Sequence, residues 1–225
     1  LNEQEKSNLR KRFNIPENAY VVGFVFRNQL RKSLPNLLAG YSMWKRQNPN
    51  IPSFLLLHTH FCEGWNIMQR AEEHGVDFKE ILTTYVCQHC RAYEVKPFVG
   101  EQNYPPQSTS PDCKYCGEKH SQCTTNVRIG VSEEQLNEVY NLMDVYCHPF
   151  TSGGQEIPIQ EAKLAGLVTC VTNYSCGEDM CVPEAQSLPL SWAEYREPGT
   201  EFIKATTFPE SIASKLQEVY LLGKE

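Results

Sequence analysis

Residues 136–177 read LNEVYNLMDVYCHPFTSGGQEIPIQEAKLAGLVTCVTNYSCG, and this stretch decides the fold of the chain. The spacing of its apolar residues predicts a helix, a strand, a glycine loop, a second helix and a second strand. Ser132 and Gln135 predict a capping box at the start of the first helix. Pro158 suits the first turn of the second helix, and Gly166 suits its end.

The glycine loop predicts an anion site. A short strand over 145–149 runs directly into Thr151-Ser152-Gly153-Gly154. Glycines let backbone N–H groups approach a ligand closely, and the amino terminus of the following helix favours negative charge. The sequence therefore predicts that this loop binds phosphate.

Strands and helices alternate along the rest of the chain as well. Residues 54–57 (FLLL) form a continuous apolar run, which is typical of a parallel strand covered on both faces. We expect an α/β fold with a Rossmann-like, doubly wound parallel sheet flanked by helices, whose ligands bind at the carboxyl ends of the strands. The expected strands cover 19–26, 53–59, 80–86 and 201–205, and the expected helices cover 2–12, 34–47 (opened by Ser33), 66–74 and 209–221.

Eight residues in the deciding stretch carry a resemblance to a known family. They are Pro149, Gly154, Ile157, Pro158, Ile159, Glu161, Ala162 and Gly166. In register, they resemble the C-terminal nucleotide-sugar-binding domain of retaining GT-B glycosyltransferases, the group-1, family-4-like enzymes with a Glu-(seven residues)-Glu signature. The resemblance implies that Glu161, the second glutamate of the signature, holds the ribose. It also implies a donor-binding segment made of Gly153, Gly154, Gln155, Glu156, Ile157 and Pro158.

The same stretch departs from the family at three positions. Gly153 stands where the family has its first glutamate, Gln155 replaces an aromatic residue, and Glu156 replaces a glycine. In the family, the first glutamate contacts sugar hydroxyls. The departure at Gly153 therefore bears on the donor-sugar contacts.

A second match follows the first expected strand. Arg27 and Lys32 are five residues apart, which is the spacing of the arginine and lysine that clamp the diphosphate in the family. A guanidinium group binds phosphate oxygens through a planar fork, and an ammonium group adds a compact charge. The resemblance implies that Arg27, Lys32 and Glu161 serve donor binding and transfer. The alternative is that Arg27, Lys32 and the neighbouring Arg31 are solvated loop cations.

Residues 87–123 interrupt the pattern and contain two CxxC pairs. Cys87 and Cys90 are separated from Cys113 and Cys116 by 22 residues. Two such pairs complete a tetrahedral shell of four thiolates, so we expect one structural Zn²⁺ ion in an inserted zinc ribbon. The proline- and serine-rich residues between the pairs cannot pack a core of their own. Disulfides or free thiols are the alternatives, although nothing here indicates the oxidising compartment that disulfides need.

Charge and hydropathy exclude several classes of partner. The formal net charge is −6, and residues 87–123 contain four basic and four acidic side chains. Nucleic-acid binding needs a positive surface, so we expect no nucleic-acid partner. No apolar run approaches the ~20 residues of a membrane span. No basic and apolar leader opens the chain, so we expect a cytoplasmic location.

These features together predict the donor-binding domain of a retaining glycosyltransferase. It covers residues 1–86 and 124–225, with the inserted zinc ribbon at 87–123. The expected partners are a nucleotide-diphosphate sugar and an N-terminal acceptor domain of the same protein, which the resemblance implies. Two alternatives stay open: a nucleotide-binding module without transfer activity, and a zinc-dependent protein-interaction module on a Rossmann scaffold.

Overall fold

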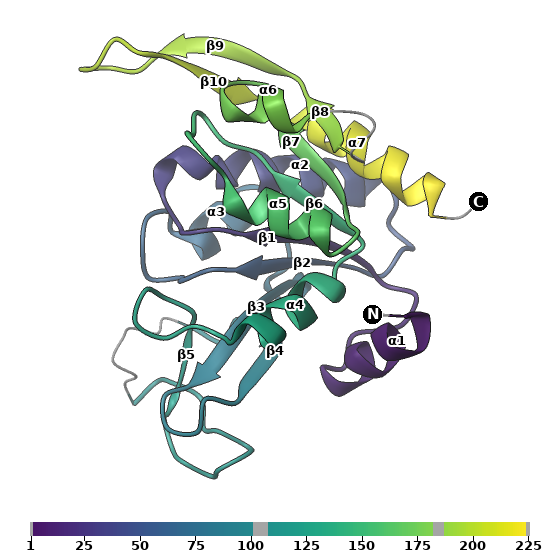
Figure 1. Ribbon diagram of the computed structural model, residues 1–225, viewed down its shortest axis with the longest axis vertical. Coiled ribbons are helices and arrows are strands. Elements are labelled where there is room, and N and C mark those ends of the chain that lie inside the picture. Colours follow the sequence, from purple (N-terminus) through teal and green to yellow (C-terminus); the bar gives the residue numbers. More distant parts are fainter. Residues whose placement is uncertain (1, 101–107, 182–186, 224–225) are drawn as a thin grey trace.

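The central element is a mostly parallel sheet, as the sequence predicted, and Figure 1 shows it in the computed structural model. The structure describes residues 2–100, 108–181 and 187–223. The strand order is β4-β3-β2-β1-β6-β7-β8, and all neighbours from β3 to β8 pair in parallel. The parallel strands are β1 (Tyr20–Val25), β2 (Ser53–His58), β3 (Ile81–Cys87), β6 (Val145–His148), β7 (Val168–Thr172) and β8 (Ser187–Leu190).

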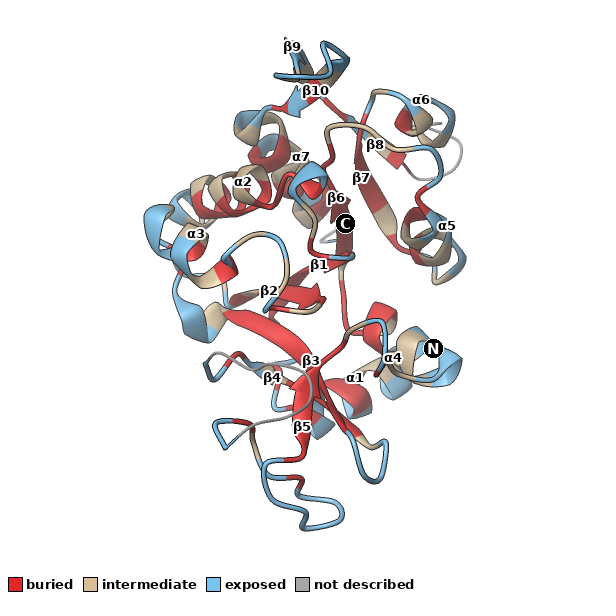
Figure 2. Cartoon of the chain, turned by 90° about the vertical axis from the view of Figure 1, so that its left-hand side faces the viewer, coloured by how far each residue is buried: buried red, intermediate tan, exposed pale blue. Residues whose placement is uncertain are grey.

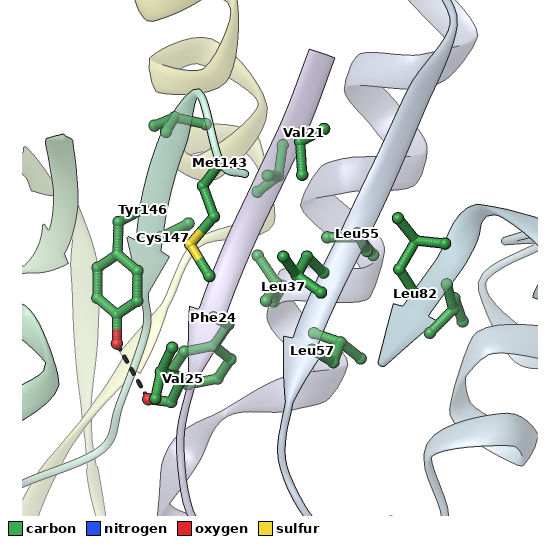
Figure 3. Packing of buried hydrophobic residues seen from close by; sticks show 14 of the residues in the cluster. Val21, Phe24, Val25, Leu37, Leu55, Leu57, Leu82, Met143, Tyr146 and Cys147 are labelled. Atoms are coloured by element: carbon green, nitrogen blue, oxygen red, sulfur yellow. Dashed lines mark hydrogen bonds between the residues drawn. The ribbon is translucent and has the colours of Figure 1, made fainter. Parts of the chain in front are cut away.

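The central strand β1 is buried along its whole length. It pairs with β2 from Tyr20↔Ser53 to Val25↔His58, and with β6 on its other side. Gly23 is required in this strand because the Met143 side chain occupies the space that a Cβ atom there would need. Figure 3 shows Met143 lying beside β1 among the buried apolar side chains.

Helices cover both faces of the sheet (Figure 2). On one face α2 packs against α3 and α7, and α4 and α5 lie on the other face, with α1 beside α4. The helices are α1 (Glu3–Arg12), α2 (Leu34–Gln47), α3 (Ile67–Glu73), α4 (Glu133–Asn141), α5 (Ile157–Leu164), α6 (Cys176–Met180) and α7 (Pro209–Leu222). Within the described ranges, no helix is long and apolar enough to cross a lipid bilayer.

The helix ends test three local predictions. The capping box is confirmed, because Gln135 N–H donates to Ser132 Oγ at 3.2 Å and Ser132 N–H donates to Gln135 Oε1 at 2.9 Å. Gly166 adopts a φ of 81° just after α5, which favours glycine. Ser33 is the residue that precedes α2, as predicted, but its φ is 44°, in the left-handed region, and its side chain makes no capping hydrogen bond.

The predicted insertion is joined to the main sheet by two strands. β4 (Tyr93–Pro97) and β5 (Gln122–Thr124) both pair antiparallel with β3. Part of the insertion, residues 101–107, lies outside the described residues. The division at 87 and 123 stays a prediction, but the described part of the insertion extends the edge of the sheet through these strands.

The carboxyl-terminal third holds elements that the sequence did not predict. β9 (Trp192–Arg196) and β10 (Ile203–Thr207) form an antiparallel hairpin, where the sequence predicted one strand near 201–205. Figure 1 shows this hairpin projecting beyond the sheet. Its base is fixed to the glycine loop, because Ala205 N–H donates to the Thr151 carbonyl at 2.9 Å.

Candidate functional site

Polar side chains gather where β1, β2 and β6 end. Because these strands are parallel, their carboxyl ends meet at one edge of the sheet. Arg27 follows β1, Thr59 follows β2, and the glycine loop follows β6. This edge is the place where the sequence predicted a ligand site.

A pocket of about 340 Å³ lies at this edge. Its walls come from the ends of β1 and β2, from the segment 125–131, and from Leu136 and Pro158. Thr59 is one of the lining residues, and its hydroxyl oxygen is buried without accessible surface and has no hydrogen-bond partner among the described residues. A buried polar group is normally hydrogen-bonded. The Thr59 hydroxyl is therefore an unsatisfied polar group beside the pocket, enclosed by the protein.

The wall at 125–131 is shaped by side-chain contacts. The side-chain Oδ1 of Asn126 accepts from the backbone N–H groups of Arg128 and Ile129, at 2.9 and 3.1 Å. Arg91, which follows the first CxxC pair, donates to the Gly130 carbonyl at 3.0 Å. The insertion therefore braces the wall of the pocket directly.

A larger pocket, of about 540 Å³, lies at the opposite edge of the sheet, between α1 and the end of α7. Three of its charged groups pair with one another: Asp144 accepts from Lys6 at 3.0 Å and from Arg10 at 2.7 Å, and also from the Val21 N–H at 2.8 Å. This network ties α1 to β1 and β6, so we assign it to stability. The smaller pocket at the carboxyl edge is the candidate ligand site.

Arg27 lies at the candidate pocket and pairs with Glu63. Its Nε and Nη2 atoms donate to Glu63 Oε1 at 2.9 and 2.5 Å, and the two side chains are 55% and 34% exposed. The Glu63 loop is fixed to the end of β1 by Asn28, which donates to the Trp65 carbonyl at 2.9 Å and accepts from the Trp65 N–H at 3.1 Å. Exposed ion pairs contribute little, about 0–1 kcal/mol, so Arg27 can exchange Glu63 for a phosphate at small cost.

Lys32 has a different partner and is buried. Its ammonium pairs with Glu156, and the two side chains are each only 4% exposed. Arg31 donates to the other oxygen of the same carboxylate at 2.7 Å. The structure therefore brings Lys32, Arg31 and Glu156 together and places Arg27 with Glu63 instead.

His148 completes the buried cluster as a neutral ring. The Tyr146 hydroxyl donates to the Val25 carbonyl at 3.0 Å, a bond drawn in Figure 3, so it accepts from His148 Nδ1 at 2.8 Å. His148 Nε2 is then the acceptor that faces Lys32 Nζ at 3.4 Å. Burial lowers the pKa of His148 to about 4, in keeping with a neutral ring at pH 7.

Glu156 and Lys32 are both shifted by burial and by each other. Burial lowers the pKa of Lys32, and contact with the Glu156 carboxylate partly offsets this. Burial also opposes ionisation of Glu156, but the ion pair with Lys32 holds its pKa well below the ordinary value. Glu156 is therefore a carboxylate at neutral pH.

The rest of the predicted donor segment is open. Gly154 and Gln155 are exposed, and Ile157 is 56% exposed. Pro158 lines the candidate pocket from the first turn of α5. Glu161 lies outside its lining, and its carboxylate accepts from the Tyr140 hydroxyl at 2.7 Å.

The four cysteines of the insertion come together as the sequence predicted. The sulfur atoms of Cys87, Cys90, Cys113 and Cys116 all lie within 4.8 Å of one another. The Cys87–Cys116 and Cys90–Cys113 sulfur distances are 3.8 and 3.6 Å. Four sulfurs ~2.3 Å from a tetrahedral ion are about 3.8 Å apart, so the geometry fits a metal of this class. Bonded sulfurs would be ~2.05 Å apart, so these are four thiols and not two disulfides.

The Cys87 thiol has a lowered pKa. Burial opposes ionisation, but contact with the Ser121 side chain and bonds from backbone N–H groups lower its pKa to about 6. A bond from the Ala92 backbone lowers the pKa of Cys90, but burial and the three neighbouring sulfurs raise it overall, because a second thiolate beside the first is unfavourable. A divalent cation removes this repulsion and suits all four sulfurs as thiolates.

Three contributors at the carboxyl edge were not predicted from the sequence. They are Glu63, Thr59 and the contact between Arg31 and Glu156. Thr59 and Glu63 could have been found as polar residues after an apolar strand, LLLHTH, that ends at the ligand edge. Nothing in the sequence indicates that Arg31 contacts a residue 125 positions away.

No protein-family model matches the sequence, and no curated protein matches it. Solved structures do match in fold. A glycosyltransferase from Rickettsia africae ESF-5 has a TM-score of 0.56, with 12% identity over 99% of this chain and 43% of that chain. The sucrose-phosphate synthase from Thermosynechococcus elongatus has a TM-score of 0.56, with 13% identity over 96% and 39%. The C-terminal domain of a glycosyl transferase group 1 family protein from Francisella tularensis has a TM-score of 0.55, with 14% identity over 98% and 83%.

The chain spans about two fifths of the first two proteins and most of the third, which is itself a C-terminal domain. At these identities the likeness establishes the fold alone. The chain therefore has the fold of the C-terminal domain of GT-B glycosyltransferases, which confirms the fold that the resemblance predicted.

Proposed function

We propose that this chain is the donor-binding domain of a retaining glycosyltransferase and that it binds a nucleotide-diphosphate sugar at the carboxyl edge of the sheet. The observation that carries the proposal is the pocket of about 340 Å³ at the carboxyl edge, with Arg27 in its lining. Its volume lies at the lower end of the range for small-molecule sites. A nucleoside base fits such a pocket between Val131 and the first turn of α5.

The proposed diphosphate lies between the pocket and the glycine loop. Arg27 is at the pocket and held only by an exposed ion pair, so its guanidinium fork is available to phosphate oxygens. In this proposal Arg27 and Lys32 stabilise the charge that develops on the leaving diphosphate, together with the backbone of 154–158. Glu161 holds the ribose. The acceptor is held by another domain of the same protein.

A nucleotide-binding module without transfer activity is the second candidate. It is favoured by Gly153 in place of a glutamate and by the neutralisation of Lys32 by Glu156. Both candidates bind nucleotide, so turnover by the full-length protein separates them.

We also propose that Cys87, Cys90, Cys113 and Cys116 bind one structural Zn²⁺ ion. The sulfur distances and the bond from Arg91 to Gly130 support a role in fixing the insertion against the pocket wall. Closed four-sulfur sites are structural, since they leave no position for a substrate.

Titration calorimetry with nucleosides and nucleoside diphosphates tests the proposed function. We expect Arg27→Ala to weaken diphosphate binding by roughly tenfold to a hundredfold, the effect of one lost charge-assisted contact, and to leave nucleoside binding nearly unchanged. Glu161→Ala should weaken both, because its proposed partner is the ribose.

Arg46→Ala is the matched control. Arg46 is an arginine near the end of α2, away from the pocket, and its removal should change neither affinity. Equal losses of nucleoside and diphosphate binding in Arg27→Ala would mean that the phosphates bind elsewhere. Absence of nucleotide binding by the unaltered chain would refute the proposed function.

A further inference from the structure

Glu156 stands in the position of a bound anion. One carboxylate oxygen pairs with Lys32, the other accepts from Arg31 at 2.7 Å, and the side chain is only 4% exposed. The same carboxylate lies against the glycine loop: a Cβ atom at Gly153 would be 2.6 Å from Glu156 Oε1. Two cations and the loop that the sequence assigned to phosphate therefore surround a carboxylate of the protein itself.

We propose that Glu156 is an internal anion which occupies Arg31 and Lys32 until a diphosphate displaces it. This inference rests on the proposed function and names how the same site is controlled. Donor binding is then an exchange of anions: the Glu156 carboxylate leaves Arg31 and Lys32, and phosphate oxygens take its place.

The local structure supports such an exchange. Glu156 makes no capping hydrogen bond to α5, so the start of that helix does not depend on its side chain. The residues before it, Gly154 and Gln155, are exposed, and a side chain at Gly154 would meet open space. The segment therefore has room to turn the carboxylate outward.

The charges also favour exchange by a diphosphate over exchange by a singly charged ion. Arg31 and Lys32 supply two positive charges, Glu156 removes one, and His148 is neutral. A diphosphate brings at least two negative charges to the same cations, so it competes with a carboxylate where chloride or acetate does not. The site would thus select its ligand by charge as well as by shape.

Titration with inorganic pyrophosphate tests the exchange without any nucleoside contact. Glu156→Gln removes the internal anion and keeps the size of the side chain. We expect pyrophosphate to bind Glu156→Gln about tenfold more tightly or better than it binds the unaltered chain, because the competing charge is gone. Unchanged or weaker binding by a folded Glu156→Gln protein would overturn the inference.

Two controls separate this effect from a general change in charge. Glu178→Gln removes an exposed carboxylate from α6 and should change pyrophosphate affinity by less than about twofold. Lys32→Met combined with Glu156→Gln removes the cation as well and should abolish the gain. A similar gain in Glu178→Gln would mean that net charge, and not Glu156, sets the affinity.

A crystal structure of the unaltered chain with pyrophosphate tests the exchange even if the Glu156→Gln protein does not fold. The exchange predicts a phosphate oxygen on Lys32 and the Glu156 carboxylate turned away from it. Pyrophosphate bound with Glu156 still on Lys32 would refute the exchange. Nucleoside binding, measured in parallel, reports on the proposed function separately because the nucleoside pocket does not include Glu156.

Discussion

The purified chain should contain one zinc ion, and Cys113→Ser should remove it. Structural zinc sites bind the ion with apparent free energies of about 10–16 kcal/mol at pH 7, and Cys113→Ser removes one of the four ligands on which this binding depends. Elemental analysis measures the stoichiometry. Hydrogen exchange after chelation should show the described part of 87–123 opening, while β1, β2 and β6 stay protected, since their core does not include the cysteine cluster.

Cys62→Ser is the control for this experiment. Cys62 is an exposed cysteine outside the cluster, so its replacement should leave the zinc content unchanged. The proposed zinc site would be refuted if the unaltered chain held no stoichiometric metal, or if Cys87 and Cys90 were joined by a disulfide.

Lys32→Met should lower the free energy of unfolding by about 3 kcal/mol. Breaking a buried ion pair typically costs ~3–5 kcal/mol because one charge is left uncompensated, and the lower end applies because Arg31 still contacts Glu156. Urea unfolding at pH 7 measures the change. Adding Glu156→Gln to Lys32→Met should recover most of the loss, since the double variant leaves no unpaired buried carboxylate.

Arg27→Met is the comparison that isolates burial. Like Lys32→Met, it removes the cation of an ion pair, but these side chains are 55% and 34% exposed. The free energy of unfolding should therefore fall by less than about 1 kcal/mol. A Lys32→Met protein as stable as Arg27→Met, or a double variant less stable than Lys32→Met alone, would show that the Lys32–Glu156 pair is not a buried ion pair.

Most of the architecture could be predicted from the sequence because it depends on local patterns. The period of the apolar residues indicated β1, β2, β3 and β6, and the capping box at Ser132 fixed the start of α4. The paired CxxC spacing brought four sulfurs together across an irregular segment. The sequence signal for the strands and for the capping box lies within a few residues. The signal for the cysteine cluster lies in the geometry with which four thiolates bind one metal ion.

The parts that failed depend on contacts between distant residues. Ser33 has the chemistry of a cap, but the turn formed by residues 30–32 sets its backbone in the left-handed region, so its side chain cannot reach the helix. Glu156 looked like a substitution in a phosphate loop, and it pairs with Lys32, 124 residues earlier. Pairings of this kind follow from the strand order, which places the ends of β1 and β6 side by side.

Dependence on contacts between distant residues also explains why the hairpin of β9 and β10 was not predicted. β9 has no buried residue, β10 buries only Ala205 and Thr207, and charged residues stand among the apolar ones, so the sequence shows no clear alternation. Their pairing with each other, and the bond from Ala205 to Thr151, stabilise them instead. Sequence periodicity reports burial, and these strands bury little.

The central claim is that a nucleotide binds at the carboxyl edge of the sheet. The most direct test is a crystal structure of the chain with the nucleoside diphosphate that binds it most tightly. The account predicts the base in the pocket beside Thr59 and Asn126, and the diphosphate directed toward Arg27 and Lys32. A nucleotide bound instead in the larger pocket beside Lys6 and Arg10, with the carboxyl edge unchanged, would contradict it.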